Sequence, residues 1–444
     1  MTIKYLPVTG HTSEASVVAI WQGREIRYAD FVTHVHEVVH KLPERQFAIN
    51  LCEDRYLFLV AFIAVLVKKQ TNLLPASKLP ALINEMAEDY TGSYVLSDNQ
   101  NLACDFLLKA DELLQVNSEK RELICIKAEH VAAVVFTSGS TGKSRPNIKR
   151  WGSLYTEAAL AIDRFALQTD DVDAIVATVP PQHMYGLVTS IIIPLLSAIK
   201  IVCAPTLYPA DIELAVNSAA GNSVLITTPI HLRACVDSGS VWDNIKFVIS
   251  ATAMMPLALA RNVEQRLQTR LYEIYGASEY GSVATRRSVN DTVWSLYEGM
   301  AILSKNGCTY LQGPQFKNDI VVHDVVEIKD SSHFELVGRD CDLIKIAGKR
   351  ISLTDLNQKL WDIDGVVDGV FFAPLESHKF NARLTAFVVA PGLSKAQVLA
   401  AMKKHIEPAF LPRPLILMAE LPRNATGKLP QKELQNLLEA MAIN

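Results

Sequence analysis

The sequence lacks an excess of either charge, a paired cysteine motif and an apolar run long enough to cross a membrane. The 444 residues carry a formal net charge of -4, so we expect no general attraction to nucleic acid or to an anionic membrane. The seven cysteines are widely scattered, and no two form Cys-x-x-Cys. This odd set argues against a disulfide framework or a zinc site and favours a reducing cytoplasm.

Hydrophobic segments are present, but they are short or interrupted. The run 56–67 is too short to span a bilayer, and the run 187–202 is broken by Pro194 and Lys200. The first seven residues contain no secretory signal core. We therefore expect both runs to be buried core elements of a cytoplasmic protein with no membrane partner, built from two or three domains.

Strand patterns and helix patterns alternate along the chain. Short strands are predicted at 46–51, 94–96, 123–126, 174–179, 223–227 and 246–250, a strand pair at 320–329, and helices at 28–39, 56–67 and 151–167. This alternation favours an α/β fold with mainly parallel sheets. In the last hundred residues we expect a smaller unit with helices at 353–363 and 394–406 and strands at 366–373, 383–389 and 414–418.

The segment 134–145 changes from an apolar strand pattern into small and hydroxylated residues, and then into two cations, Lys143 and Arg145. Small side chains let the backbone approach a ligand, and successive N–H groups with Ser and Thr hydroxyls form an anion site. The pattern therefore predicts a triphosphate-binding loop. A flexible linker is one alternative. A Walker-type loop is another, although it needs glycine at position 137, where this chain has Thr.

This segment resembles the phosphate loop of the acyl-adenylate-forming superfamily, which includes acyl- and aryl-CoA synthetases, nonribosomal peptide adenylation domains and luciferases. The match runs from Thr137 to Gly142, and the chain departs from the pattern at Ser144 and Pro146. The resemblance implies ATP and Mg²⁺ as cofactors. It implies these nucleotide-binding residues: Thr137, Ser138, Gly139, Ser140, Thr141, Gly142 and Lys143.

A glycine turn at 275–279 matches the family's Tyr-Gly-x-Thr/Ser-Glu motif. A carboxylate beside a triphosphate makes chemical sense only if a cation lies between them. The resemblance implies that Tyr275 stacks on the adenine, that Gly276 belongs to the nucleotide site, that Ser278 contacts the α-phosphate region and that Glu279 helps to hold a Mg²⁺ ion. A solvated surface glutamate is the alternative for Glu279.

Further nucleotide contacts are implied at three separate positions. Ala253 lies in a turn that borders the adenine in the family, where Ala251 replaces a usual glycine. Asp324 takes the place of the aspartate that holds the ribose hydroxyls, and Arg339 that of a ribose-binding arginine. The segment 180–186 resembles the family's Pro-x-x-His-x-x-Gly.

That last segment implies that the carboxylate end of an acid substrate meets His183, Tyr185 and Gly186. His183 would be a catalytic residue, and an ordinary surface histidine is the alternative. The stretch 336–351 resembles the hinge before a small mobile lid, which divides the chain into residues 1–338 and 339–444. The pivot is Cys341, where the family has Asp or Lys, and Lys428 takes the place of the catalytic lysine.

These parts imply an AMP-forming acid:thiol ligase. It would join an aryl or medium-length carboxylic acid to ATP as an acyl-adenylate, release pyrophosphate, and pass the acyl group to the phosphopantetheine thiol of an acyl carrier protein. Coenzyme A is the alternative acceptor. A P-loop NTPase that makes ADP remains open, as does an inactive binding or scaffold homologue. Cys341 and a shortened segment near 311 favour the inactive homologue, whereas Lys428, Glu279 and Thr141 oppose it.

Overall fold

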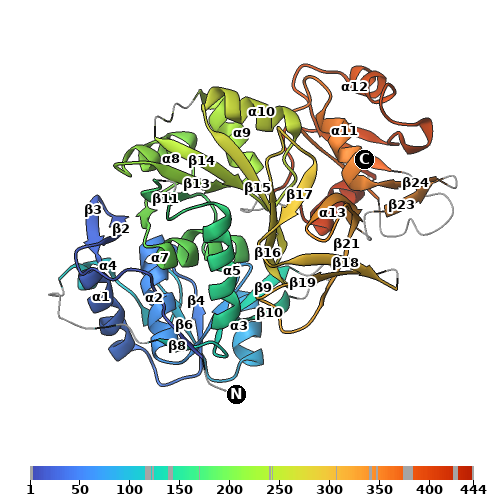
Figure 1. Cartoon of the computed structure of the whole chain (residues 1–444). Coiled ribbons are helices and arrows are strands. Elements are labelled where there is room, and N and C mark those ends of the chain that lie inside the picture. Colours follow the sequence, from blue (N-terminus) through green and yellow to red (C-terminus); the bar gives the residue numbers. More distant parts are fainter. Residues whose placement is uncertain are drawn as a thin grey trace.

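Two large β-sheets form the body of the protein (Figure 1). The computed structural model describes residues 4–115, 122, 125–138, 144–169, 171–239, 242, 244–306, 308–339, 343–346, 349–373, 384–423 and 429–442. In the first sheet the strand order is β10 (Ser144–Arg150), β9 (Val131–Ser138), β5 (Thr71–Leu74), β4 (Phe47–Asn50), β6 (Ser93–Ser97) and β7 (Phe106–Leu107). All its neighbours pair in parallel except β9 and β10, which form an antiparallel hairpin.

The second sheet is parallel at its centre and antiparallel at both sides. Within the described residues its order is β21 (Asp324–Ile328), β22 (His333–Arg339), β17 (Val293–Leu296), β16 (Gly281–Arg286), β15 (Arg270–Ala277), β14 (Ile245–Ser250), β13 (Ser223–Thr227), β11 (Ala174–Ala177), β12 (Lys200–Cys203), β2 (Val17–Trp21) and β3 (Arg24–Arg27). Strands β15, β14, β13, β11, β12 and β2 run parallel.

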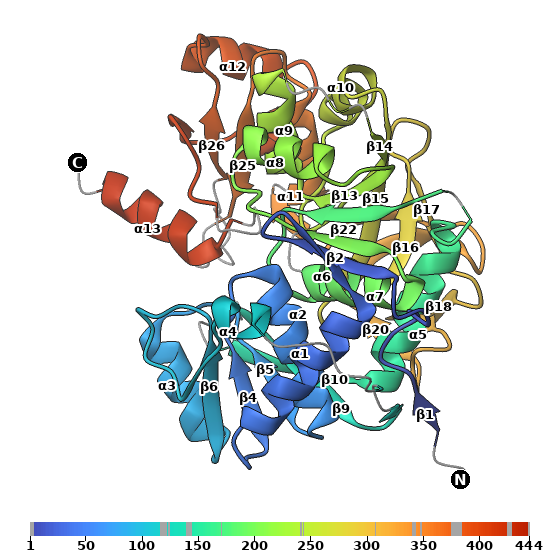
Figure 2. The ribbon, with the colours of Figure 1, turned by 90° about the vertical axis from the view of Figure 1, so that its left-hand side faces the viewer.

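Helices fill the space between the sheets and cover their outer faces (Figure 2). Between the sheets lie α1 (Tyr28–Lys41), α2 (Arg55–Val67), α5 (Trp151–Arg164) and the continuous segment α6 (Met184–Leu187), η1 (Val188–Ile192) and α7 (Ile193–Ser197). Outside the second sheet lie α8 (Pro209–Asn217), α9 (Pro229–Ser238) and α10 (Leu257–Arg266). Outside the first sheet lies α3 (Pro80–Asp89), and α4 (Ala110–Leu114) follows β7.

The central strands are apolar throughout because both of their faces are buried. In β13, Val224 and Ile226 face the core between the sheets, whereas Leu225 faces the core under α8, α9 and α10. In α2 every residue from Tyr56 to Leu66 is buried. The two apolar runs of the sequence are thus core elements, and among the described residues no helix has both the length and the apolar character that spanning a bilayer requires.

A smaller C-terminal part lies on the side of the second sheet, away from the first (Figures 1 and 2). It contains β23 (Leu343–Ile346), β24 (Lys349–Ser352), α11 (Leu353–Trp361), β25 (Asp368–Phe372), β26 (Thr385–Val389), α12 (Lys395–Met402), η4 (Pro408–Phe410), β27 (Leu415–Leu417) and α13 (Gln431–Ala442). It has its own core, formed by residues of α11, α12 and the β25–β26–β27 sheet.

The expected α/β fold, with a large N-terminal and a small C-terminal domain, is confirmed, and two local details differ. Residues 320–329 form two strands, but β20 (Ile320–Val322) joins β18 (Ala301–Lys305) and β19 (Cys308–Gln312), whereas β21 joins the second sheet. Of the strand predicted at 123–126, Leu123 and Ile124 lie outside the described residues, and Ile126 opens β8 (Ile126–Lys127), which pairs with β1 (Tyr5–Leu6). The strand β10 was not predicted at all.

Candidate functional site

The segment predicted to bind phosphate lies at the turn of the β9–β10 hairpin. Thr137 is the Cα partner of Arg145, and Ser138 that of Ser144. Five predicted residues, Gly139, Ser140, Thr141, Gly142 and Lys143, lie outside the described residues. The Walker alternative is wrong, because in a P-loop the Gly-Lys-Ser sequence opens a helix, whereas here Ser144 opens a strand.

The turn that carries Ser278 and Glu279 joins two antiparallel strands, β15 and β16. The Glu279 side chain is exposed, and its backbone carbonyl accepts a hydrogen bond from Lys149 Nζ at 3.1 Å. Lys149 belongs to β10. The hairpin of the first sheet therefore touches the glutamate turn of the second sheet, which brings two separate sequence motifs together (Figure 1).

The surroundings of Glu279 fit one kind of metal ion. Among the described residues, none forms an ion pair with its carboxylate, and no group of three or more His, Cys, Asp or Glu is arranged to hold a metal. Mg²⁺ keeps several waters and is usually bound by one or two carboxylates together with substrate phosphates. A single exposed carboxylate beside the phosphate-loop hairpin suits such an ion, and it would not make a closed protein cage.

Tyr275 links the predicted adenine and ribose positions. Its ring packs against Trp294 and Phe334, with centroids 5.5 Å and 5.2 Å away. Its hydroxyl donates to Asp324 Oδ2 at 2.5 Å and accepts from the Tyr280 hydroxyl at 3.2 Å. Burial, followed by the neighbouring Tyr280 and Asp324, raises the pKa of Tyr275 far above its usual value, so the phenol stays a neutral donor.

The two residues predicted to hold the ribose are neighbours across a strand pair. Asp324 opens β21, Arg339 closes β22, and the two are Cα partners in the antiparallel register. Fourteen residues separate them in the sequence, and the pairing of β21 with β22 brings them together.

The turn predicted to border the adenine has an unusual backbone. Thr252, next to Ala253, has φ of 77°, in the left-handed region that β-branched residues rarely adopt. Such a conformation costs about 1–3 kcal/mol and persists only where the surroundings impose it. In the same turn, the Met255 N–H donates to Glu273 Oε2 of β15 at 3.3 Å.

The segment predicted to meet the acid begins α6. His183 is the N-cap residue, and its Nδ1 accepts a hydrogen bond from the Tyr185 N–H at 3.3 Å. In a neutral imidazole that accepts at Nδ1, the proton lies on Nε2, which is then a donor. Gly186 has a packing role, because a Cβ there would lie 2.1 Å from the Pro180 carbonyl oxygen.

The Tyr185 hydroxyl is already used by the protein. It lies 2.9 Å from the Ile249 carbonyl oxygen and 3.2 Å from that of Thr227, at the carboxyl ends of β14 and β13. Ligands in α/β proteins bind beyond the carboxyl ends of the parallel strands. Tyr185 therefore fixes α6 against that edge, and its ring rather than its hydroxyl is what a ligand could meet.

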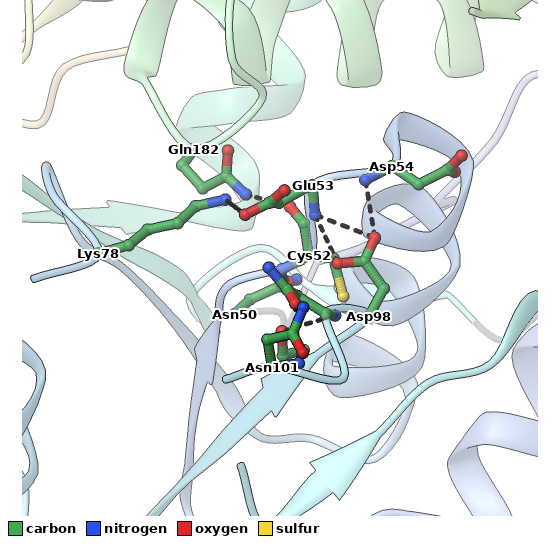
Figure 3. A network of polar contacts seen from close by, with 10 residues as sticks. Asn50, Cys52, Glu53, Asp54, Lys78, Asp98, Asn101 and Gln182 are labelled. Carbon is green, nitrogen blue, oxygen red and sulfur yellow. Dashed lines mark hydrogen bonds and ion pairs between the residues drawn. The ribbon is translucent and has the colours of Figure 1, made fainter. Parts of the chain in front are cut away.

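A set of polar contacts joins the first sheet and α2 to the turn before His183, and no motif in the sequence predicts it. Arg55 donates to the carbonyls of Ala177 and Val179 at 3.0 and 2.8 Å, and Gln182 Nε2 donates to the Cys52 carbonyl. Figure 3 shows Gln182 reaching Cys52 beside the loop in which Asp98 accepts from the backbones of Glu53 and Asp54. The one available signal was an arginine at the start of a wholly apolar helix.

The predicted lid residues are only partly described. The backbone of Arg339 ends β22, while Cys341 and Lys428 lie outside the described residues. Arg423 lies five positions before Lys428 and forms a two-pronged ion pair with Asp368 of β25, with Nε–Oδ2 at 2.8 Å and Nη2–Oδ1 at 2.7 Å. This ion pair attaches the chain shortly before Lys428 to the β25–β26–β27 sheet.

Comparison with known proteins agrees with this arrangement. A family model described as AMP-binding enzyme matches residues 27–303. A 4-coumarate–CoA ligase from Halorhodospira halophila is 27% identical over 345 residues, which cover 72% of this chain and 81% of that protein. A 3,4-dihydroxybenzoate–aryl-carrier protein ligase from Bacillus anthracis is 20% identical over 323 residues, covering 71% and 76%.

Solved structures show the same fold over nearly the whole chain. The o-succinylbenzoate coenzyme A synthetase from Bacillus subtilis, in complex with ATP and magnesium ion, has a TM-score of 0.79 at 16% identity. The match covers 95% of this chain and 96% of that chain. The resemblance inferred from the motifs is thereby confirmed. Since the family model covers more than half of the residues, the chain belongs to the AMP-binding enzyme family.

Proposed function

We propose that the protein is an AMP-forming acid:thiol ligase. It activates an aryl or medium-length carboxylic acid with ATP, releases pyrophosphate, and transfers the acyl group to a phosphopantetheine thiol. The observation that carries the proposal is the convergence of three motifs. Asp324 and Arg339 are Cα partners across a strand pair, Tyr275 bonds to Asp324, and the turn after Tyr275 is bonded to the phosphate-loop hairpin through Lys149.

Adenylation brings two anions together, so catalysis consists mostly of positioning and of neutralising charge. The hydroxyls and N–H groups of the phosphate loop would hold the triphosphate, Glu279 would hold Mg²⁺, and Lys428 would stabilise the charge at the α-phosphate. When bound, the magnesium ion supplies electrostatic stabilisation of the phosphate oxygens. His183 would donate from Nε2 to the acid's carboxylate.

For the acceptor we propose an acyl carrier protein. The curated relatives include both acceptor types, because the Bacillus anthracis relative is named an aryl-carrier protein ligase and the Halorhodospira halophila relative a CoA ligase. Coenzyme A is therefore the second candidate. It is favoured by the relative with the higher identity.

We also propose that residues 339–444 act as a lid that pivots near Cys341. The chain leaves the second sheet after Arg339, and the next strand, β23, pairs only with β24 among the described residues. A change in the backbone angles between these strands would rotate the small domain and move Lys428 towards or away from the nucleotide.

Exchange of labelled pyrophosphate into ATP, measured over a panel of aryl and medium-length acids, tests the first half-reaction. We expect exchange that depends on the acid. Thioester formation with holo-carrier protein and with coenzyme A then identifies the acceptor. An inactive homologue predicts no exchange with any acid, and that result, together with absence of ATP binding, would overturn the proposal.

A further inference from the structure

We propose that Lys149, Glu157 and Gln315 are positioning residues which hold the Glu279 turn in its metal-binding arrangement. The inference rests on the proposed function, because it concerns the carboxylate that would bind Mg²⁺. None of the three side chains belongs to a family motif identified in the sequence. Their common property is that each bonds to backbone groups of the turn from Glu279 to Ser282.

The bonds reach the carbonyls of Glu279, Tyr280 and Ser282 and the N–H of Ser282. Lys149 Nζ donates to the Glu279 carbonyl at 3.1 Å. Gln315 Nε2 donates to the carbonyls of Tyr280 and Ser282 at 3.1 and 3.3 Å. Glu157 Oε1 accepts from the Ser282 N–H at 2.6 Å and from its hydroxyl at 2.8 Å. The turn is thus held by side chains from outside its own hairpin.

All three side chains are buried. Lys149 is 6% exposed, Glu157 4% and Gln315 7%. Burial lowers the pKa of Lys149 and raises that of Glu157, while the charge of each acts against the shift of the other. Buried charges are costly unless they are paired and hydrogen-bonded. Here the backbone of the turn supplies the hydrogen bonds. The two buried charges therefore have their bonds only while the turn keeps this position, and the two side chains in turn hold the turn there.

Gly281 is what allows the carboxylate to come close. Its φ is +81°, and a Cβ at this position would lie 2.2 Å from Glu157 Oε2. Any larger residue would displace either the carboxylate or the turn. The glycine immediately after the Glu279–Tyr280 pair therefore has a role in seating Glu157, in addition to its left-handed conformation.

The two charged residues also belong to the segment that carries the phosphate loop. Lys149 is the penultimate residue of β10, and Glu157 lies in α5, which begins at Trp151. From the same helix, Ser153 Oγ donates to the Gln315 carbonyl at 3.1 Å. One continuous stretch therefore provides the second strand of the phosphate-loop hairpin and the groups that fix the Glu279 turn. The β9–β10 hairpin and the Glu279 turn are therefore linked through residues of this one stretch.

The test is the Mg²⁺ dependence of ATP binding, measured by calorimetry on the full chain in the absence of acid. In Lys149→Met the turn loses a donor, and Glu279 is expected to sample other positions. The free Mg²⁺ concentration that gives half-maximal ATP binding should rise about tenfold, as loss of residues that orient metal ligands does elsewhere. Glu157→Gln should shift it in the same direction, by less.

Lys68→Met is the matched control. Lys68 is also largely buried and donates to the carbonyls of Leu42 and Val39 at 2.7 and 3.2 Å, at the end of α2. It should lose stability without changing the Mg²⁺ midpoint. The double variant Lys149→Met with Glu157→Gln removes both buried charges. Its melting temperature should be higher than that of Lys149→Met, while the free Mg²⁺ concentration that gives half-maximal ATP binding stays high.

Equal Mg²⁺ midpoints in folded Lys149→Met, Glu157→Gln and Lys68→Met would overturn the inference. If Lys149→Met does not fold, Glu157→Gln and the double variant decide the matter by the same criterion. Failure of the proposed function looks different, because the unaltered protein would then show no ATP binding that depends on Mg²⁺.

Discussion

Replacing Tyr275 with Phe removes one hydroxyl and leaves the ring in place. That hydroxyl donates to Asp324 Oδ2 at 2.5 Å, and Asp324 is the residue proposed to hold the ribose. The ring should keep its contacts with Trp294 and Phe334, since Phe fills the same space. The variant therefore tests whether the hydrogen bond that orients the Asp324 carboxylate affects ATP binding without affecting binding of the acid.

The size of the effect follows from the kind of bond. A hydrogen bond to a charged group contributes about 1.5–3 kcal/mol. Asp324 is half-buried, so water replaces part of the lost bond, and we expect about 1–2 kcal/mol, or a five- to thirtyfold rise in KM for ATP. The melting temperature should fall by less than about 3 °C, because the ring keeps its apolar contacts and the loss of one hydrogen bond shifts the Tm of a large domain only slightly.

The assay is pyrophosphate exchange, with ATP varied at saturating acid and then acid varied at saturating ATP. Tyr280→Phe is the control: it removes the donor to the Tyr275 hydroxyl but leaves the bond from Tyr275 to Asp324. Its KM for ATP should stay close to that of the unaltered protein. An unchanged KM for ATP in Tyr275→Phe, or an equal rise in both KM values, would refute the reasoning.

Three further predictions concern other parts of the protein. His183→Ala should raise KM for the acid about tenfold and leave that for ATP unchanged, since it removes a donor to a charged group; equal effects on both would make His183 structural. Lys428→Ala should nearly abolish acyl-adenylate formation, whereas the same variant should still convert a synthetic acyl-adenylate to thioester, and equal loss of both steps would contradict a moving lid. Burial lowers the pKa of His11 from 6.5 to about 4, so the unfolded chain binds this proton first and the free energy of unfolding should fall as the pH drops from about 6.5 to 4. In urea titrations His11→Gln should show a shallower loss over that range, and an unchanged slope would count against it.

Strands that are buried on both faces were predictable from the sequence, and β10 was not. The strand predicted at 223–227 has the same bounds as β13, because an uninterrupted apolar run ends there at polar residues. In contrast, β10 contains Pro146 and three cations and shows no apolar pattern. It becomes a strand by pairing with β9 along seven residues, which is an interaction that the local sequence does not contain.

The candidate site also has parts that the sequence predicts and parts that it does not. Motifs made of adjacent residues, such as 275–279, could be identified because their chemistry is contained in a few positions. The contacts between motifs could not. The bond from Lys149 to the Glu279 carbonyl joins residues 130 positions apart, and Arg55 reaches the Val179 carbonyl over 124 positions. Such residues have no sequence signature, because their partners are specified only once both sheets have formed.

The placement of the N-terminal strands has a consequence for how the chain is made. Strand β2 leaves the ribosome well before its parallel partner, β12, which follows about 180 residues later and takes on the order of 10–40 s at usual synthesis rates. The first sheet, whose strands all lie between residues 47 and 150, can assemble during this interval. Until β12 emerges, the apolar edge of Val17–Trp21 has no strand to pair with except β3. An unpaired apolar edge invites association with other nascent chains, so chaperone demand during translation should be greatest before residue 203 appears.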